Sequence, residues 1–139
     1  MSNSSESSIF ETCVLNADRL SFLPRHFGSR MLTFERWVYM QMSHLSEEYS
    51  GGYWDYYELS NGGCYIAPTG TLSFTICIEG NGYCGRFDAK GAGIVATLFA
   101  LSLLSFRHPD FDRFAERFHQ LRDFALERHD AREILAAID

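Results

Sequence analysis

An acidic pair, a set of cysteines and a glycine-rich run are the groups in this sequence whose residue types suggest chemistry. Asp55 and Glu58 lie among aromatic rings in the stretch "GGYWDYYELSNGGCYIAP" (51–68). Glycoside chemistry uses two carboxylates that flank one bond. Three residues apart on a strand, these two point to opposite faces, so they cannot flank one bond unaided. The pair therefore predicts no catalytic site by itself.

The four cysteines are Cys13, Cys64, Cys77 and Cys84, and they contain no C-x-x-C pair. The five histidines form no H-x-H or H-x-x-x-H grouping. Metal sites usually pair ligands at short spacing, so we predict neither a metal ion nor a cofactor. In a reducing compartment the thiols are expected to be free and mostly buried as small apolar groups.

A cysteine-dependent enzyme is the weakest of the functional hypotheses that the residues leave open. A cysteine nucleophile needs an activating base nearby. Cys77 and Cys84 flank a turn, but no histidine lies close to them in sequence. A base brought near by the fold stays open, and no catalytic constellation stands out.

The run "GNGYCG" (80–85) matches the G-x-G-x-x-G pattern of dinucleotide sites. Such a site requires a strand before the run, a helix directly after it and an acid about twenty residues later. Here the run joins two extended segments, and the region near Ser105 offers no acid. We predict a hairpin turn made by Gly80, Asn81 and Gly82.

The net charge of −6 is spread along the chain without a basic stripe, which disfavours direct nucleic-acid binding. Mimicry of DNA is also disfavoured. Duplex DNA carries about one charge per 1.7 Å, so six net charges imitate only about 10 Å of it.

At 139 residues the chain fits one domain with a single core. We expect a flexible segment over residues 1–12 and a single domain over residues 13–139. No basic-then-apolar signal segment is present, which predicts a cytoplasmic protein.

The elements expected before the strands are an irregular strap over 19–31 and one helix. Pro24 and Gly28 interrupt the strap. Thr33 then resembles an N-cap, with Glu35 in the first turn, where the helix dipole favours an acid. An apolar face at 3.6-residue spacing follows, and Gly51 and Gly52 are predicted to end the helix as a left-handed cap.

About four antiparallel strands are expected next, as a meander that is apolar on one side. Asn61, Gly62 and Gly63 predict one turn, and the run at 80–82 another. "TLSFTICIE" (71–79) alternates cleanly, with Leu72, Phe74, Ile76 and Ile78 on one face.

The last third of the chain is predicted to be helical. Asp88 is a plausible N-cap for a buried helix to Phe106, whose Gly91 and Gly93 suit a close backbone approach. The uncharged part of that helix is short for a membrane span, which needs about twenty residues. Pro109 is predicted to start an amphipathic helix, and "DARE" (130–133) a last short one. The fold class is therefore α+β: an antiparallel sheet packed against an N-terminal helix and a C-terminal group of helices.

Several motifs, taken together and in order, resemble the ArdB/KlcA antirestriction family. They are "RLSFLPRHFG", "YSGGYWDYYELSNGGCYIAP", "GNGY", "GAGIVATLFALS" and "LRDFALERHDAREILAAID". The resemblance runs from about Arg19 to Asp139. Cys64 stands where the family pattern has an aromatic residue, and "ERHDA" replaces a His-Pro-Glu type of turn.

The resemblance implies a non-enzymatic protein of a mobile genetic element that relieves type I restriction of incoming unmodified DNA. It implies action through contact with the restriction complex or with a host factor that controls it. Among motif residues, Arg19, Glu35 and Trp54 are the candidates for interaction, because Trp and Arg are favoured interface anchors. A salt bridge, a helix-dipole acid and a core ring are their structural alternatives.

A small binding module is the second hypothesis. It would use the aromatic strand face, including Trp54 and Tyr56, for a peptide or a carbohydrate.

Overall fold

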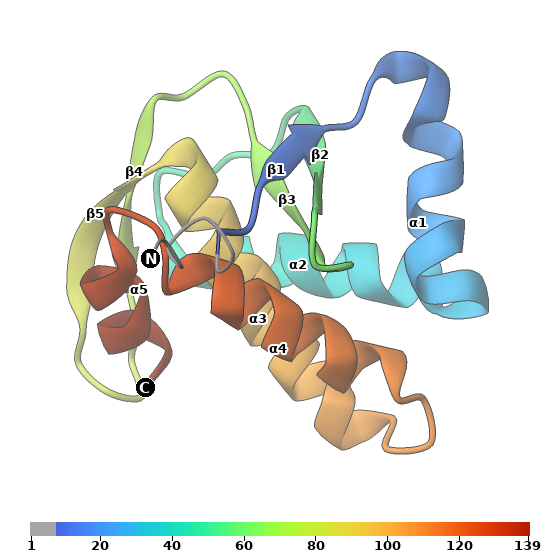
Figure 1. The fold of residues 1–139 in the computed structure, drawn as a ribbon. Helices are drawn as coiled ribbons and strands as arrows, with labels where there is room; N and C mark the ends of the chain where they lie inside the picture. The colour runs from blue at the N-terminus through green and yellow to red at the C-terminus, as the bar shows by residue number, and fades with distance from the viewer. Residues whose placement is uncertain (1–7) are drawn as a thin grey trace, which may run out of the picture.

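The computed structural model describes residues 8–139 and has the predicted α+β class. The elements in chain order are β1 (Glu11–Cys13), η2 (Asn16–Asp18), α1 (Arg19–Phe27), η3 (Gly28–Arg30), α2 (Met31–Leu45), β2 (Trp54–Leu59), β3 (Cys64–Pro68), β4 (Ser73–Cys77), β5 (Cys84–Asp88), α3 (Ala89–Arg107), α4 (Arg113–Ala125) and α5 (Ala131–Ile138). Figure 1 shows α3 at the centre, with strands and helices around it.

The strands form two antiparallel sheets rather than one meander. The first has the order β1-β2-β3, and the second is the β4-β5 hairpin. Pro68, which has no N–H to donate, ends β3, and Gly70 takes a φ of +87° before β4 begins. Beyond this bend Leu72 is 92 % exposed, so it does not share the buried face of Phe74 and Ile76.

The first strand was not expected, because residues 1–12 were predicted to be flexible. Glu11 pairs with Leu59 and Cys13 with Tyr57, so this part of the segment belongs to the first sheet. Residues 1–7 of the segment lie outside the described residues. That residues 13–139 form a single domain stays a prediction.

The predicted strap over 19–31 is wrong, since Arg19–Phe27 is a helix that contains Pro24. Phe22, Leu23, His26 and Phe27 are buried on one side of it, at the i, i+1, i+4, i+5 spacing of a helical face. Most helical stability in proteins comes from burial of such a face, which here outweighs the cost of an internal proline. Gly28, with a φ of +54°, ends the helix.

The boundaries of α2 also differ from those predicted. The helix begins at Met31, so Thr33 is inside it and is not the N-cap, and Glu35 lies beyond the first turn. It ends at Leu45, where Ser46 is extended. Gly51 and Gly52 have φ values of +95° and +122°, but they lie in the loop before β2 rather than at the helix end.

Helix α3 is central and largely buried, as predicted, and Asp88 caps it by accepting a hydrogen bond from the Gly91 N–H at 2.7 Å. A Cβ on Gly93 would lie 2.5 Å from the Ile66 carbonyl oxygen, so glycine lets α3 approach β3 closely. The 19-residue helix has the length and apolarity of a membrane span, but 61 % of its apolar window is buried inside the protein. A core helix of a globular protein has the same properties.

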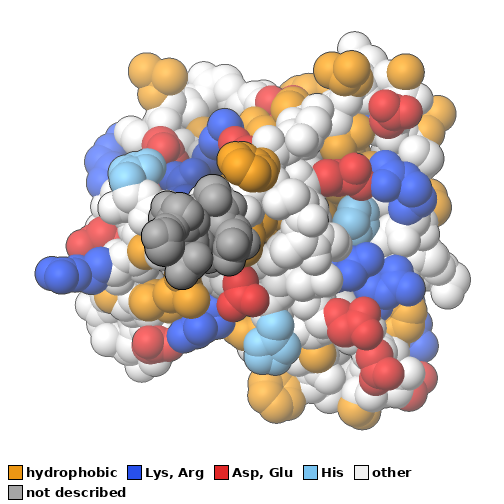
Figure 2. All heavy atoms as spheres, in the orientation of Figure 1, with side chains coloured by type: hydrophobic (Ala, Val, Ile, Leu, Met, Phe, Trp, Pro, Cys, Tyr) orange, Lys and Arg blue, Asp and Glu red, His pale blue; other side chains and the backbone are white. Residues whose placement is uncertain are grey.

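Helices α4 and α5 complete the fold. α4 starts at Arg113 and not at Pro109, and it packs along α3 (Figure 1). α5 follows Asp130 as predicted, but that side chain binds Arg128 instead of capping the helix. Figure 2 shows acidic and basic side chains interspersed on the face drawn, in keeping with the dispersed charge of the sequence.

Candidate functional site

Arg19, Glu35 and Trp54 come together in the structure, although they lie on α1, α2 and β2. The Arg19 Nη2 donates to the Trp54 carbonyl oxygen at 2.9 Å. Its guanidinium lies 4.5 Å from the ring centre of Tyr53 and 4.1 Å from that of Tyr56. Cation–π contacts of this kind fix the arginine on the aromatic strand. Within residues 8–139 Arg19 makes no salt bridge, which was its structural alternative.

Glu35 is an acceptor for two phenols. The Tyr39 hydroxyl donates to its Oε2 at 2.9 Å, and the Tyr56 hydroxyl does so at 3.1 Å. Burial and the carboxylate of Glu35 raise the pKa of both tyrosines. Both phenols therefore stay protonated and keep donating at neutral pH. Glu35 joins α2 to β2 instead of serving the helix dipole.

Trp54 is a core ring, with only 2 % of its surface exposed. Its Nε1 donates to the Tyr49 hydroxyl at 3.0 Å. The Tyr39 ring lies 5.1 Å from it in a tilted arrangement, and the Tyr49 ring lies 5.7 Å away, edge-on. A partner would thus meet the tyrosines around Trp54 rather than the indole itself.

The outer side of this cluster is a shallow hollow of about 510 Å³ between α2 and the loop before β2. We call it the tyrosine hollow; it is lined by Arg36, Tyr39, Met40, Ser43, Tyr49, Ser50 and Gly51. Tyr, Met and Arg are enriched at the centres of protein interfaces. The sequence signal for it is the i, i+3, i+4, i+7 spacing of residues 36, 39, 40 and 43, which marks a second face of α2. The apolar face of α2 is the stronger pattern, so this second face was not predicted.

The turn of Asn61, Gly62 and Gly63 has a tertiary role as well as a local one. The Asn61 Oδ1 accepts from the Gly63 N–H at 3.0 Å, while its Nδ2 donates to the Gln120 carbonyl oxygen at 2.9 Å. Gly62 has a φ of +94°, and a Cβ on Gly63 would lie 2.8 Å from the Gln120 Cβ. The predicted turn therefore also anchors α4.

The second turn, Gly80 to Gly82, anchors α5 in the same way. Gly82 has a φ of +75°, and the Asn81 Oδ1 accepts from the Tyr83 N–H at 2.9 Å. The Asn81 Nδ2 donates to the carbonyl oxygens of Ala136 and Ala137, at 3.3 and 3.1 Å. The run joins the antiparallel strands β4 and β5.

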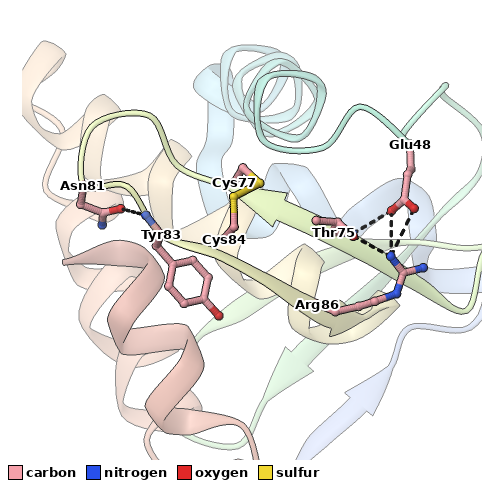
Figure 3. The surroundings of a disulfide bond; sticks show 7 residues. All are labelled: Glu48, Thr75, Cys77, Asn81, Tyr83, Cys84 and Arg86. Carbon is pink, nitrogen blue, oxygen red and sulfur yellow. Dashed lines mark hydrogen bonds and ion pairs between the residues drawn. A yellow bond between two sulfur atoms is a disulfide. The ribbon is translucent and has the colours of Figure 1, made fainter.

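The expectation of four free thiols is wrong for two of them. Cys77 and Cys84 face each other at the end of the β4-β5 hairpin and form a disulfide (Figure 3). Seven residues apart in sequence, they are brought side by side by the turn between them. Cys13 is free and exposed, and Cys64 is free and buried.

The buried thiol has no nucleophilic character. Burial raises the pKa of Cys64 to about 12, so it stays protonated. Among the residues that the structure describes, no group of three or more His, Cys, Asp or Glu side chains is placed to hold a metal ion.

A polar network around the buried His26, which the sequence did not reveal, joins α1, β2 and α4. The His26 Nε2 lies 3.1 Å from the Glu58 Oε2, which also pairs with Arg25 at 2.5 Å. The Nδ1 of His26 accepts from the Arg117 Nε at 2.9 Å. Burial and the charge of Arg117 lower the pKa of His26 to about 4, so the ring is neutral and donates to Glu58. The network holds α1 against β2 and α4.

Comparisons with known proteins agree with the fold and the motifs. The family model described as "Antirestriction protein" matches residues 47–139 of this chain. The chain belongs to the antirestriction protein family. One Escherichia coli relative, "Antirestriction protein KlcA", is 45 % identical over 96 % of this chain and 95 % of its own length. A second protein of that name from the same organism is 42 % identical over 99 % of each chain.

A solved structure of the antirestriction family has the same fold. It has a TM-score of 0.85 and 44 % identity, and the similarity covers 94 % of this chain and 95 % of that one. It is described as showing for the KlcA and ArdB proteins "a novel fold and antirestriction activity against Type I DNA restriction systems in vivo but not in vitro".

Proposed function

We propose that this protein relieves type I restriction of incoming unmodified DNA, through protein contacts and without an enzymatic step. In this proposal it is a cytoplasmic product of a mobile genetic element. Its partner is the type I restriction complex or a host factor that controls it. The observation that carries the proposal is the 44 % identity and TM-score of 0.85 to a structure with reported antirestriction activity.

The small net charge of the protein favours action through a cellular partner over mimicry of DNA. The net charge of −6 corresponds to only about 10 Å of duplex, and basic side chains lie among the acidic ones on the face that Figure 2 shows. The related proteins are described as active in vivo but not in vitro. Such a difference favours a contact that needs a component of the cell.

The tyrosine hollow is the surface that we propose for this contact. Met40, which lines the hollow, is 37 % exposed. Arg36 is exposed and has no ion-pair partner among the described residues. The binding-module hypothesis loses its basis, because Trp54 and Tyr56 are only 2 % and 8 % exposed and cannot form a platform for a sugar.

Unmodified phage plated on cells that carry a type I system, with and without this protein, tests the proposed function. We expect unmodified phage to plate more efficiently on cells that contain the protein. Fully modified phage should plate equally well with and without it. Undiminished restriction in cells that contain the folded protein would refute the proposal.

A variant pair then tests the surface. We expect the double substitution Arg36→Glu and Met40→Ala, at two exposed lining residues, to abolish relief while thermal stability stays near that of the wild type. The control is Arg132→Glu, an exposed arginine on α5, which should retain full relief. Equal relief by both variants would exclude the tyrosine hollow as the contact surface.

A further inference from the structure

Helix α3 carries more apolar surface than the core uses. Phe99, Leu103 and Phe106 follow one another at helical spacing on the side away from β3. Phe99 is partly buried, whereas Leu103 is 40 % and Phe106 81 % exposed. A helix that is apolar all round is normally covered all round. The stripe formed by Phe99, Leu103 and Phe106 is therefore an apolar face that no other described residue fully covers.

The stripe borders a groove of about 970 Å³ that is separate from the tyrosine hollow. We call it the α3 groove. Its apolar lining comes from three elements that are distant in sequence: Leu45 at the end of α2, Ile78 after β4, and Phe99 and Leu103 on α3. Its size lies in the range of cavities that accept apolar groups of a ligand or a partner.

The rim of the α3 groove is acidic. Glu47, Glu48 and Glu79 line it, and none of its lining residues is a lysine or an arginine. Glu48 accepts from the Thr75 N–H at 2.7 Å and pairs with Arg86 at 3.2 Å. Glu47 and Glu79 are exposed, and neither has an ion-pair partner within residues 8–139. Two carboxylates thus remain available beside an apolar floor.

The wall of the groove that carries Ile78 and Glu79 is held on both sides. The disulfide between Cys77 and Cys84 closes the end of the hairpin, and Glu48 fastens the hairpin to the segment after α2 by accepting hydrogen bonds from Arg86 and from the Thr75 N–H (Figure 3). A groove whose walls are fixed before binding loses less conformational freedom when a partner docks.

We propose that the α3 groove binds a basic amphipathic segment of a protein partner. Its apolar side chains would cover Phe99 and Leu103, and its Lys or Arg side chains would pair with Glu47 and Glu79. Amphipathic helices commonly bind to apolar grooves in this way, and complementary charge fixes orientation and selectivity. An anionic membrane would be repelled by the rim. A second copy docked groove to groove would bring like charges together.

Peptide binding by the α3 groove is independent of the proposed function, because it is measured on the purified protein and does not depend on the result of the restriction assay. The probe is an 18-residue amphipathic helix of Leu and Lys, labelled with a fluorophore. A second peptide of the same composition, in an order that spreads Leu around the helix, is the control. We expect the amphipathic peptide to bind more tightly.

Three variants locate the binding. We expect Leu103→Asp, and separately the pair Glu47→Lys and Glu79→Lys, to weaken binding by roughly tenfold or more. The matched control is Glu116→Lys with Asp123→Lys on α4, which makes the same change in net charge at exposed positions and should leave affinity within about twofold. Circular dichroism confirms folding of each variant, and the charge-reversal pair remains informative if Leu103→Asp does not fold.

Three outcomes would overturn the proposal. The first is that the two groove variants bind like the wild type or like the α4 control. The second is that the wild type binds phosphatidylglycerol vesicles in place of the peptide. The third is a concentration-dependent dimer, abolished by Leu103→Asp, which would assign the groove to a second copy of the chain.

Discussion

At the scale of single residues, the buried histidine is the group most sensitive to solution conditions. His26 is 6 % exposed and lies among Glu58, Arg25 and Arg117. Its pKa is about 4 in the folded chain, against 6.5 for an unperturbed histidine. Between these two values the unfolded chain binds more protons than the folded one, so acid favours unfolding.

We therefore expect the free energy of unfolding to be steady from pH 8 to 7 and to fall as the pH drops from 6.5 to 4. The contribution of His26 to this fall is about 3 kcal/mol or less. Partial burial raises the pKa of Glu58, but its bonds from Arg25 and His26 lower it overall, so loss of this carboxylate in acid adds in the same direction. Urea denaturation at several pH values measures the slope.

The histidine is identified as the cause by replacing it. His26→Gln should flatten the slope between pH 6.5 and 4, while His119→Gln at an exposed position should leave it unchanged. An unaltered slope in His26→Gln would show that another group controls acid stability.

Trp54 is the residue for which structure most changes the expected mutant behaviour. Since the ring is buried, Trp54→Ala should lower the free energy of unfolding by about 3–5 kcal/mol and reduce restriction relief along with it. The exposed neighbour is the control: Tyr53→Ala should leave the midpoint of thermal unfolding nearly unchanged. Loss of relief by Trp54→Ala at unchanged stability would instead make the indole a contact residue.

At the scale of elements, close packing of α3 on β3 depends on a glycine. Alanine is a better helix former than glycine by roughly 1 kcal/mol, so Gly93→Ala would stabilise an isolated helix. Here its Cβ would lie 2.5 Å from the Ile66 carbonyl oxygen and 2.6 Å from the Ala67 Cα. We expect a net loss of about 1–3 kcal/mol from this overpacking, measured by urea denaturation.

A second glycine offers the matched control. A Cβ on Gly80 would meet nothing within 4 Å, and its φ is not positive, so Gly80→Ala should change stability little. A gain of stability in Gly93→Ala would mean that the sheet moves away from α3 at no cost.

The β4-β5 hairpin is the element that reducing agents should affect. Its disulfide closes a short loop, and by chain entropy it contributes about 2 kcal/mol. We expect dithiothreitol, or the pair Cys77→Ser and Cys84→Ser, to lower the midpoint of thermal unfolding by several degrees. Cys13→Ser, which removes an exposed free thiol, is the control. If the oxidised and reduced proteins had the same midpoint of thermal unfolding, the disulfide would not stabilise the fold.

At the scale of the whole molecule, dispersed charge governs what the protein meets. With a net charge of −6 and no basic stripe, we expect no retardation of duplex DNA in gels at physiological salt. A known DNA-binding protein in the same buffer is the positive control. Salt-sensitive retardation by this protein would contradict a function through protein contacts alone.

The sequence by itself determined the features that depend on local pattern. Apolar periodicity predicts α2 and α4, and an uncharged run after a helix cap predicts α3. Aromatic content, alternation at 71–79 and two Asn-Gly turns predict β2 to β5. Asp88 as a helix cap and Gly93 as a close approach also follow from residue type. The ordered motifs were enough to indicate the antirestriction family, because motif order along the chain requires no knowledge of contacts.

Only the tertiary structure decided features that depend on long-range contacts. Helix α1 contains a proline and forms because its apolar face is buried, which no local rule reports. Strand β1 pairs with residues more than forty positions away, and the disulfide depends on hairpin register. The convergence of Arg19, Glu35 and Trp54 rests on contacts between α1, α2 and β2. Local residue spacing does not predict these contacts, because their energy depends on which distant surfaces the fold brings together.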